Sequence, residues 1–439
     1  AATFTGVLTY EDVTNVDSVG IITARTDVLV GSTIKLGASS GIITATSFRG
    51  DASQMTGAGL GTDGSANTSG IVTAAAFVPT QQLAFSNRNV IHNGSMMVSQ
   101  RGISQTGANS SGYKKAPDRW RFNANGANVG AYTVNRSTDN PGEFAFSYHV
   151  DCSTARSPSN NEMLELEQRI EGRNLQRFAK GTASARQFAL SFSVKTNVTG
   201  TYVVLLLDGQ NSRMCMKTYT VSNTNWNRYN LIFPADTSGT WDFSTSTRLS
   251  VKFVLMAGTD FTSGTAQTTW GSAVDANSRV GQTANVGSST SNDWRITGVQ
   301  LEAGPVVTPY EHKDYTIVMR ECMRYLYTTG TLGSGVWNSA NTFFVSVHCP
   351  VPMRVVPTIS QHSGSFGNVN IEYNDTYGVN SLSQASSGHG SGQANFAMQY
   401  SGFHTFVVAL GTSYNGTSGD GGVCLMDQNN DMFILSSEL

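Results

Sequence analysis

The side chains with the clearest chemical use are aromatic rings and histidines in the last hundred or so residues, in loops rich in Gly, Ser and Asn. Aromatic faces pack against the C–H surfaces of sugars, while amide and imidazole groups bind sugar hydroxyls. The sequence therefore predicts glycan contacts by six residues: Trp337, His362, Tyr377, His389, His404 and Tyr414. Tyr373, Tyr400 and Phe403 fall in predicted strands, so we interpret them as core or subunit-interface residues.

Motifs for catalysis lack the structural context that they require. Gly59-Leu-Gly-Thr-Asp-Gly64 has the spacing of a dinucleotide loop, but neither a buried strand before it nor a helix after it is predicted. The seven histidines form no His-Glu-x-x-His run, and no Gly-x-Ser-x-Gly elbow occurs. We expect no enzyme and no cofactor. A polysaccharide depolymerase remains the alternative, because folding alone can place two carboxylates across a groove.

Metal and thiol chemistry are also not expected. Asp427, Asn429, Asp431 and Glu438 imitate the spacing of a calcium loop, but Met432 stands where the sharp turn needs Gly. A hairpin loop joining strands at 423–425 and 433–435 explains the same polar residues, although a metal in this region stays an open question. The five cysteines are widely spaced, which predicts buried free thiols rather than disulfides.

The composition indicates the elements that must position these side chains. Only 13% of the 439 residues are charged, while Gly contributes 45, which is typical of many short strands and turns. The net charge of -2 gives no electrostatic reason to bind nucleic acid or an anionic membrane. No segment approaches the roughly 18 apolar residues of a membrane span.

The first part of the chain repeats itself. Ser18-Val-Gly-Ile-Ile-Thr-Ala-Arg25 recurs as Ser40-Gly-Ile-Ile-Thr-Ala-Thr46 and as Ser69-Gly-Ile-Val-Thr-Ala-Ala75. Each copy is a short β-branched strand followed by a turn, with few large apolar partners in one chain. We therefore predict an intertwined, repetitive β shaft over residues 1–86, completed by three copies of the chain.

A β-sandwich is predicted over residues 87–312. Alternating apolar residues occur at 188–194, 229–233 and 249–255, and the continuous apolar run 202–207 predicts a strand that is covered on both sides. We interpret Asp118, Arg119 and Trp120 as a buried ion pair beneath an indole at the sandwich edge, and residues 300–302 as the last strand.

Residues 313–329 are predicted to form a linker helix that begins near Asp314 and lasts about four turns. Its single apolar stripe can pack against the sandwich of its own chain or against the same helix in two other chains. A second all-β region, the tip at residues 330–439, follows with strands expected near residues 343–345, 371–373, 396–398, 403–408, 423–425 and 432–435.

Residues 87 to about 328 resemble a module of tail-fibre and virion-associated proteins from tailed bacteriophages, notably those that infect marine cyanobacteria. Three segments carry the resemblance: Asn89-Val-Ile-His-Asn-Gly-Ser-Met96 with Gln100-Arg-Gly102, Pro117-Asp-Arg-Trp-Arg-Phe122, and Trp294-Arg-Ile-Thr-Gly-Val-Gln-Leu-Glu-Ala-Gly304 continuing into Thr308-Pro-Tyr-Glu-His312 and Cys322-Met-Arg-Tyr-Leu-Tyr327. The family's sandwich looks like a carbohydrate-binding-module jelly roll. The repeats from residue 18 resemble shaft sequences of the same phages.

The resemblance implies an all-β, homotrimeric tail fibre located in the virion. It implies partners of three kinds: two further copies of the chain, other tail proteins at the N-terminus, and a host surface polysaccharide such as lipopolysaccharide. No nucleic acid and no membrane insertion are expected. Besides the depolymerase, a decoration or collar fibre that binds no receptor is a further alternative. The identity of the receptor is left open by the sequence.

Overall fold

The computed structural model describes residues 87–329 and, beyond them, residues 331–339, 342–361, 369–375, 378–384, 397–401, 405–411, 421–426 and 433–439. In the repetitive region it describes only β1 (Lys35–Leu36) and β2 (Ile43–Thr44), which pair antiparallel. The described residues are mostly β-strand, with two α-helices among them: α1 (Thr259–Thr262) and α2 (Tyr315–Met323). The predicted trimeric shaft lies outside the described residues.

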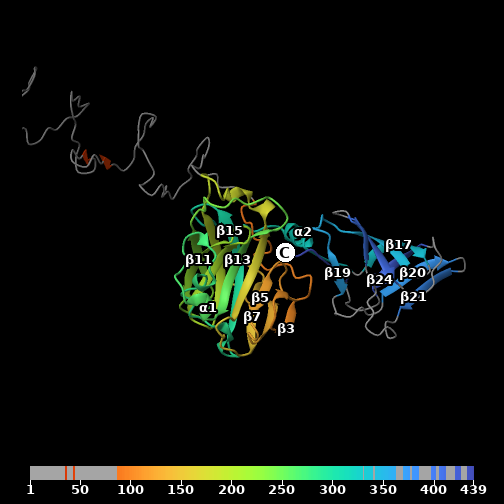
Figure 1. Ribbon diagram of the computed structural model, residues 1–439, viewed down its shortest axis with the longest axis horizontal. Helices are drawn as coiled ribbons and strands as arrows, with labels where there is room; N and C mark the ends of the chain where they lie inside the picture. The colour runs from red at the N-terminus through yellow and green to blue at the C-terminus, as the bar shows by residue number, and fades with distance from the viewer. Residues whose placement is uncertain are drawn as a thin grey trace, which may run out of the picture. The chain divides into compact units, whose positions relative to one another are not determined.

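Two antiparallel sheets form a sandwich over residues 104–303 (Figure 1). The seven-stranded sheet has the order β14 (Gly271–Ser272), β11 (Arg213–Val221), β10 (Gly200–Asp208), β13 (Thr247–Ala257), β8 (Met163–Glu171), β5 (Arg121–Asn125) and β4 (Gly112–Tyr113). The six-stranded sheet has the order β12 (Asn227–Phe233), β9 (Phe188–Thr196), β15 (Asp293–Ala303), β7 (Ser147–Thr154), β6 (Ala131–Ser137) and β3 (Ser104–Ala108).

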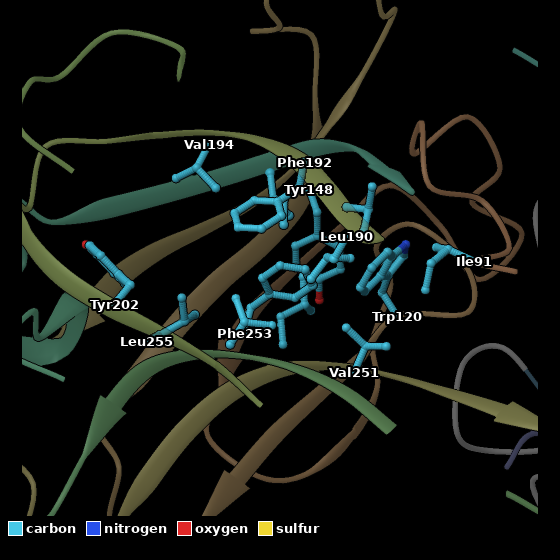
Figure 2. Close-up of a cluster of buried hydrophobic side chains, with 14 of the residues drawn as sticks. Ile91, Trp120, Tyr148, Leu190, Phe192, Val194, Tyr202, Val251, Phe253 and Leu255 are labelled. Atoms are coloured by element: carbon cyan, nitrogen blue, oxygen red, sulfur yellow. The ribbon is translucent and has the colours of Figure 1, made fainter. Parts of the chain in front are cut away.

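The core lies between these sheets. Alternation along β9 and β13 places Phe192 and Phe253 inward, where their rings meet edge to face at 5.0 Å between centroids (Figure 2). The predicted inward faces of residues 188–194 and 249–255 are therefore confirmed. The predicted double cover of 202–207 is also confirmed, because Val203 and Leu205 pack in a second apolar cluster on the outer side of β10.

Two of the three motif segments meet at a bulge in β15. The register of β15 against β9 shifts between Thr297 and Gln300, and Gly298 adopts a φ of 62°, which residues other than glycine disfavour. Gly94 O accepts a hydrogen bond from Val299 N, and Asn89 Nδ2 donates to Val299 O. A Cβ at Gly94 would lie 2.1 Å from Val299 O, so this approach needs glycine. The motifs are thus structural.

The linker helix is shorter than predicted. Asp314 accepts a hydrogen bond from Thr316 N and caps α2 at the predicted start, but the helix ends at Met323. Leu326 begins a strand instead. Val318 and Cys322 pack against Val98, so the apolar stripe of α2 contacts the sandwich of its own chain. Tyr315 and Ile317 are each 49% exposed.

Two further antiparallel sheets follow α2. The smaller contains β16 (Leu326–Thr329), β25 (Phe433–Ser436) and β19 (Thr358–Gln361). The larger has the order β21 (Gly378–Gln384), β20 (Val369–Asp375), β24 (Gly421–Met426), β17 (Thr331–Ser339), β18 (Thr342–His348), β23 (Thr405–Gly411) and β22 (Ala397–Ser401). The six strands predicted after residue 330 are confirmed, with small differences in their bounds.

One predicted pairing is wrong. Strands near 423–425 and 433–435 were expected to form a hairpin, but β24 lies between β20 and β17 while β25 lies between β16 and β19. β24 and β25, which follow one another in the chain, therefore belong to two different sheets. The local sequence pattern predicts that a strand forms, but which strand it pairs with depends on residues far away in the sequence.

Candidate functional site

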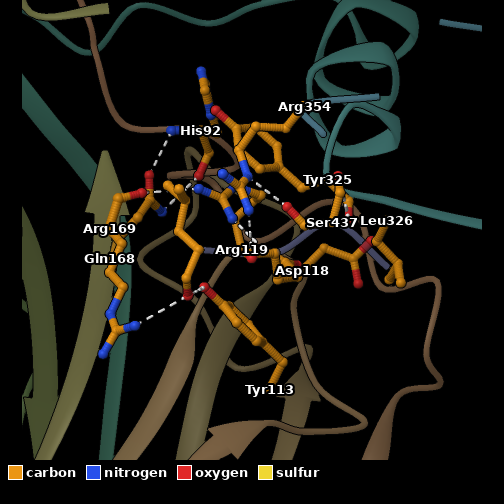
Figure 3. Close-up of polar contacts among 12 residues, drawn as sticks. His92, Tyr113, Asp118, Arg119, Gln168, Arg169, Tyr325, Leu326, Arg354 and Ser437 are labelled. Atoms are coloured by element: carbon orange, nitrogen blue, oxygen red, sulfur yellow. Dashed lines mark hydrogen bonds and ion pairs between the residues drawn. The ribbon is translucent and has the colours of Figure 1, made fainter. Parts of the chain in front are cut away.

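The last residues of the sequence bind back to the sandwich through a group of polar side chains, which we call the polar joint: Asp118, Arg119, Glu171, Arg324, Tyr325, Arg354 and Glu438. Figure 3 shows Asp118, Arg119, Tyr325 and Arg354 of this group together with Ser437. Figure 1 places the C-terminus beside α2, and Ser437 Oγ donates to Arg324 O at 3.0 Å. The joint fixes where the region beyond residue 329 leaves the sandwich and where it returns.

Arg119 is the central cation of the polar joint. It is fully buried, has a φ of 73°, and donates to a carboxylate oxygen of Glu438 and to Arg169 O at 2.8 Å. Its guanidinium carbon lies 3.5 Å from the centre of the Tyr325 ring. The predicted ion pair with Asp118 beneath an indole is therefore wrong: the anion is Glu438 and the ring is a phenol.

The neighbours of Arg119 in sequence hold a loop. Trp120 Nε1 donates to Asn93 O at 3.1 Å, and Asp118 accepts from Gln100 N and Gln100 Nε2 at 3.0 and 2.8 Å. Burial raises the pKa of Asp118 to about 6, against the opposing influence of nearby Arg101. Gln100 Nε2 also donates to Leu326 O, so this loop contacts the first strand of the small sheet.

Glu171 joins the seven-stranded sheet to the segment after α2. Arg324 donates from Nε and a terminal nitrogen to the two oxygens of Glu171 at 2.8 and 2.9 Å, and the Tyr325 hydroxyl donates to the same carboxylate. Burial favours the neutral acid, but the bonds from Arg324 and Tyr325 outweigh it and lower the pKa of Glu171. The carboxylate therefore stays ionised at neutral pH.

The return of the chain is fixed by backbone carbonyls. Arg354 donates to Ser437 O at 2.6 Å, to Glu438 O at 3.0 Å and to Thr245 O of the sandwich at 3.0 Å. In the small sheet, Thr329 at the end of β16 pairs with Phe433 at the start of β25. Residues 330–432 therefore leave and re-enter at neighbouring strand positions, and both positions are held on the sandwich.

Two polar cavities lie beside the polar joint. The first, of about 410 Å³, is lined by ten residues: Asn87, Asn89, Val90, His92, Arg173, Asn174, Gln176, Arg177, Lys313 and Glu321. Most of its charged groups already have partners, since Lys313 pairs with Glu321 at 2.7 Å and Arg173 with Glu171 at 3.4 Å. Arg177 donates to Asn87 O. These groups act on one another rather than on a ligand.

The second cavity, of about 400 Å³, lies between the sandwich edge and the small sheet, and we call it the joint cavity. Its lining combines an aromatic ring, two cations, an amide, two hydroxyls and one aliphatic side chain: Arg101, Gln105, Tyr113, Lys115, Thr358, Ile434 and Ser436. Tyr113 also donates to Leu439 O at 3.2 Å. Burial raises the pKa of Tyr113 to about 12, so its hydroxyl remains protonated.

The glycan contacts predicted from sequence are mostly not placed. Trp337 lies in β17 opposite Phe343, so it belongs to a strand rather than to a loop. Tyr373 and Tyr400 lie in β20 and β22, as predicted. Five of the predicted contacts fall outside the described residues: His362, Tyr377, His389, His404 and Tyr414. Their role stays a prediction.

The structure describes the side chains of one residue of the calcium-like spacing and of four of the five cysteines. Asp427, Asn429 and Asp431 lie outside the described residues, while Glu438 pairs with Arg119 and Arg101. Within the described ranges, no three His, Cys, Asp or Glu side chains group as metal ligands. Four cysteines have described side chains and are buried free thiols, as predicted: Cys152, Cys215, Cys322 and Cys349.

Sequence reasoning missed the joint cavity and most of the polar joint. The only signal was the resemblance, which covered Gln100–Gly102, Asp118–Arg119 and Tyr325 without showing that they meet the last residues.

None of the helices in the described part of the chain combines the length and apolar character needed to cross a membrane.

Comparison with known proteins adds little to this description. No family model and no curated protein matches the chain. It aligns with the enzymatically active domain of tailspike protein 4 of bacteriophage CBA120 at 16% identity and a TM-score of 0.27, over 49% of this chain and 21% of that one. It thus spans about a fifth of the tailspike structure.

Two sugar-related structures align over similar lengths. A putative sugar-binding protein from Bacteroides thetaiotaomicron aligns at 12% identity and a TM-score of 0.28, over 49% of this chain and 99% of that one. The family 11 carbohydrate-binding module of a Clostridium thermocellum cellulase aligns at 11% identity and a TM-score of 0.24, over 44% and 91%. Similarities this low support no conclusion about what this chain binds.

Proposed function

We propose that this chain is a structural, non-catalytic fibre subunit of a tailed-bacteriophage virion. It works as a homotrimer, joins other tail proteins through its N-terminal part, and binds a glycan on the host cell surface. The resemblance of residues 87 to about 328 to phage fibre modules supports the phage assignment. The repeats of the first part of the chain support the trimer, because one copy supplies too few apolar partners for its isoleucines.

The observation that carries the proposal is the way the chain presents residues 330–432. Both ends of this segment are held beside the sandwich, and within the segment the chain returns there once more, through Arg354 and β19. The sequence of the segment is rich in Gly, Ser, Asn and His between its described strands, and the polar side chains among these residues suit contact with sugar hydroxyls. The large sheet makes up the other described strands of the segment, and an element anchored at its ends in this way can present a surface.

Weak sugar contacts suffice for adhesion in a trimeric fibre. Three copies of the displayed segment sit at high effective concentration relative to one another once the first has bound, and several fibres per particle increase this further. Glycan contacts from Trp337, Tyr377, His389 and Tyr414, with His362 and His404, then need only modest individual affinity. The receptor is expected to be a repeating surface polysaccharide.

The neighbouring positions of Thr329 and Phe433 provide a clean test. Residues 330–432 are replaced by Asn-Gly, the two-residue turn that closes an antiparallel hairpin. The replacement also removes β19 and Arg354, so the fold of the variant is checked independently. The full chain and this hairpin variant are labelled and mixed with a panel of marine cyanobacterial strains. We expect the full chain to bind at least one strain and the hairpin variant, still folded by circular dichroism, to bind none.

Three outcomes would overturn parts of the proposal. If the hairpin variant bound cells as well as the full chain does, residues 330–432 would not contact the receptor. Binding by neither protein to any strain would favour a decoration or collar fibre. Release of reducing sugar ends from host polysaccharide by the full chain would show that it is a depolymerase.

A further inference from the structure

The joint cavity differs from the first cavity in having groups without partners. Gln105 accepts from Lys115 N through its carbonyl oxygen, at 3.1 Å, which leaves the two hydrogens of its amide nitrogen for other acceptors. The ammonium of Lys115 has no partner among the described residues and is only partly buried. Strongly hydrated donors at the wall of a cavity favour an incoming acceptor over an apolar molecule.

The small sheet supplies the opposite wall. Thr358 and Ser436 pair across β19 and β25, and Ile434 lies two positions before Ser436, so the three share one face of the sheet. Leu435, on the other face, is fully buried. The alternation that buries Leu435 therefore turns two hydroxyls and one aliphatic side chain toward the cavity.

The charged residues that line the joint cavity are all positive. Arg101 and Lys115 are cations, and none of the seven lining residues is a carboxylate. Arg101 pairs with Glu438 at 3.3 Å, but that carboxylate also binds the buried Arg119. Two guanidinium groups thus share one carboxylate behind the cavity, and Lys115 adds a further positive charge. The cavity favours a ligand that carries a negative charge.

We propose that the joint cavity binds one anionic sugar residue, a uronic acid or a similarly carboxylated saccharide. This inference rests on the proposed function, because it gives the host glycan a chemical class. The volume of about 400 Å³ lies within the range of small-molecule sites. The carboxylate binds Lys115 and the available edge of Arg101. Gln105 and Ser436 bind hydroxyls, Thr358 accepts from a hydroxyl because its own proton is donated to Ser436 O at 3.2 Å, and Tyr113 and Ile434 contact the C–H surface.

The test compares two trisaccharides that differ only in charge. Trigalacturonate carries a carboxylate on each ring, and α-1,4-linked galactotriose has the same linkage and stereochemistry with hydroxymethyl groups instead. Binding of each to the full chain is measured by titration calorimetry and saturation-transfer NMR. We expect trigalacturonate to bind at least about tenfold more tightly, because a charge-assisted hydrogen bond is worth more than a neutral one.

Two lysine variants locate the site. Lys115→Ala is expected to weaken trigalacturonate binding about tenfold and to leave galactotriose binding unchanged. Lys217→Ala is the matched control: Lys217 is also partly buried, and lies on β11, separated from β4 by four strands of the same sheet. It is expected to change neither affinity. Neither substitution touches a residue of the polar joint, so both variants should unfold at the wild-type temperature.

The outcomes separate this inference from the proposed function. Equal affinity for the two trisaccharides, no binding of trigalacturonate, or equal loss in both lysine variants would overturn the anionic-sugar site. If cells are still bound by the full chain in any of these cases, the adhesive function stands without this site. If trigalacturonate binds as expected but cells are not bound, the site stands and the host-binding proposal fails.

Discussion

Arg119 shows why the resemblance motifs are structural at the scale of single residues. Its guanidinium is fully buried and lies against the Tyr325 ring, where a lone cation would be strongly unfavourable. Glu438, 319 residues away in sequence, supplies the compensating charge. The stability of the sandwich edge therefore depends on a residue near the far end of the sequence.

We predict that Glu438→Gln lowers the free energy of unfolding by about 3 kcal/mol, because it leaves the buried Arg119 without a counter-ion. Urea unfolding followed by tryptophan fluorescence measures the change. The control is Glu143→Gln, since Glu143 is exposed, and a change below about 0.5 kcal/mol is expected for it. Equal stability of the two variants would mean that the pair contributes nothing.

Asp118 should give the protein a distinctive dependence on pH. Burial raises the pKa of its carboxyl to about 6 in the folded state, above the ordinary value of 3.8. Between about pH 4 and 6 the folded state then holds a proton that the unfolded state has lost. Acidification through this window therefore stabilises the fold, and that contribution is lost as the pH rises through 6.

We predict that the unfolding free energy of the wild type, minus that of Asp118→Asn, falls by up to about 3 kcal/mol from pH 4 to pH 6. Subtraction cancels the other carboxylates, whose contributions are common to both proteins. The constant cost of the altered bond with Gln100 does not vary with pH. A difference that rises with pH would instead mean that the folded state holds Asp118 ionised throughout this range.

At the scale of elements, the bulge in β15 organises the motif segments. Residues 89–94 bind to β15 where its register shifts, and Gly298 has the positive φ that the bulge needs. The sequence predicted a strand at residues 300–302, because the apolar pattern is local. It did not predict the bulge or the contact of the two motifs, since neither leaves a periodic signal.

We predict that Gly298→Ala destabilises the sandwich by about 2 kcal/mol or more, because a Cβ there meets the Phe144 ring at 2.5 Å and a φ of 62° is unfavourable for alanine. Thermal unfolding measures the loss. Gly209→Ala is the control, since it has no atom within 4 Å of its added Cβ and no positive φ. A variant as stable as this control would show that β15 can lose its bulge.

The helix and the small sheet show the limit of local patterns. Tyr325 and Leu326 continue the helical spacing of α2, so the sequence extended the helix to residue 329. They leave the helix because Tyr325 binds Glu171 and Leu326 pairs with Ser436. Both partners are more than a hundred residues away. Strand existence was predictable from alternation, whereas the choice of partner depended on contacts that only the fold reveals.

At the scale of the whole molecule, the candidate sites were harder to predict than the layers. The joint cavity brings Arg101 and Lys115 together with Thr358 and Ser436, and no sequence spacing connects these pairs. The glycan contacts were predicted from residue type alone, and an aromatic residue is common both in sugar-binding sites and in β-strands. Trp337 illustrates this, because it lies in β17.

We predict that the full chain sediments with a mass near three times 46.9 kDa, and that the hairpin variant also remains a trimer. The expected physical reason is the repetitive first segment, whose isoleucines lack partners within one chain. Sedimentation equilibrium over a range of concentrations measures the mass. A stable monomer at micromolar concentration would contradict the trimer and, with it, the proposed avidity.

The pairing of Thr329 with Phe433 also has an evolutionary consequence. Adjacent strands lie about 5 Å apart, so the junctions around residues 330–432 accept any folded insert whose own ends are close together. Genetic recombination at these two points would exchange the insert as a unit while the contacts of Arg119 with Glu438 and of Glu171 with Arg324 persist. The contacts of Arg354, which lies within the insert, would be exchanged with it. For the receptor-binding fibre proposed above, such an exchange would change the host range in one step.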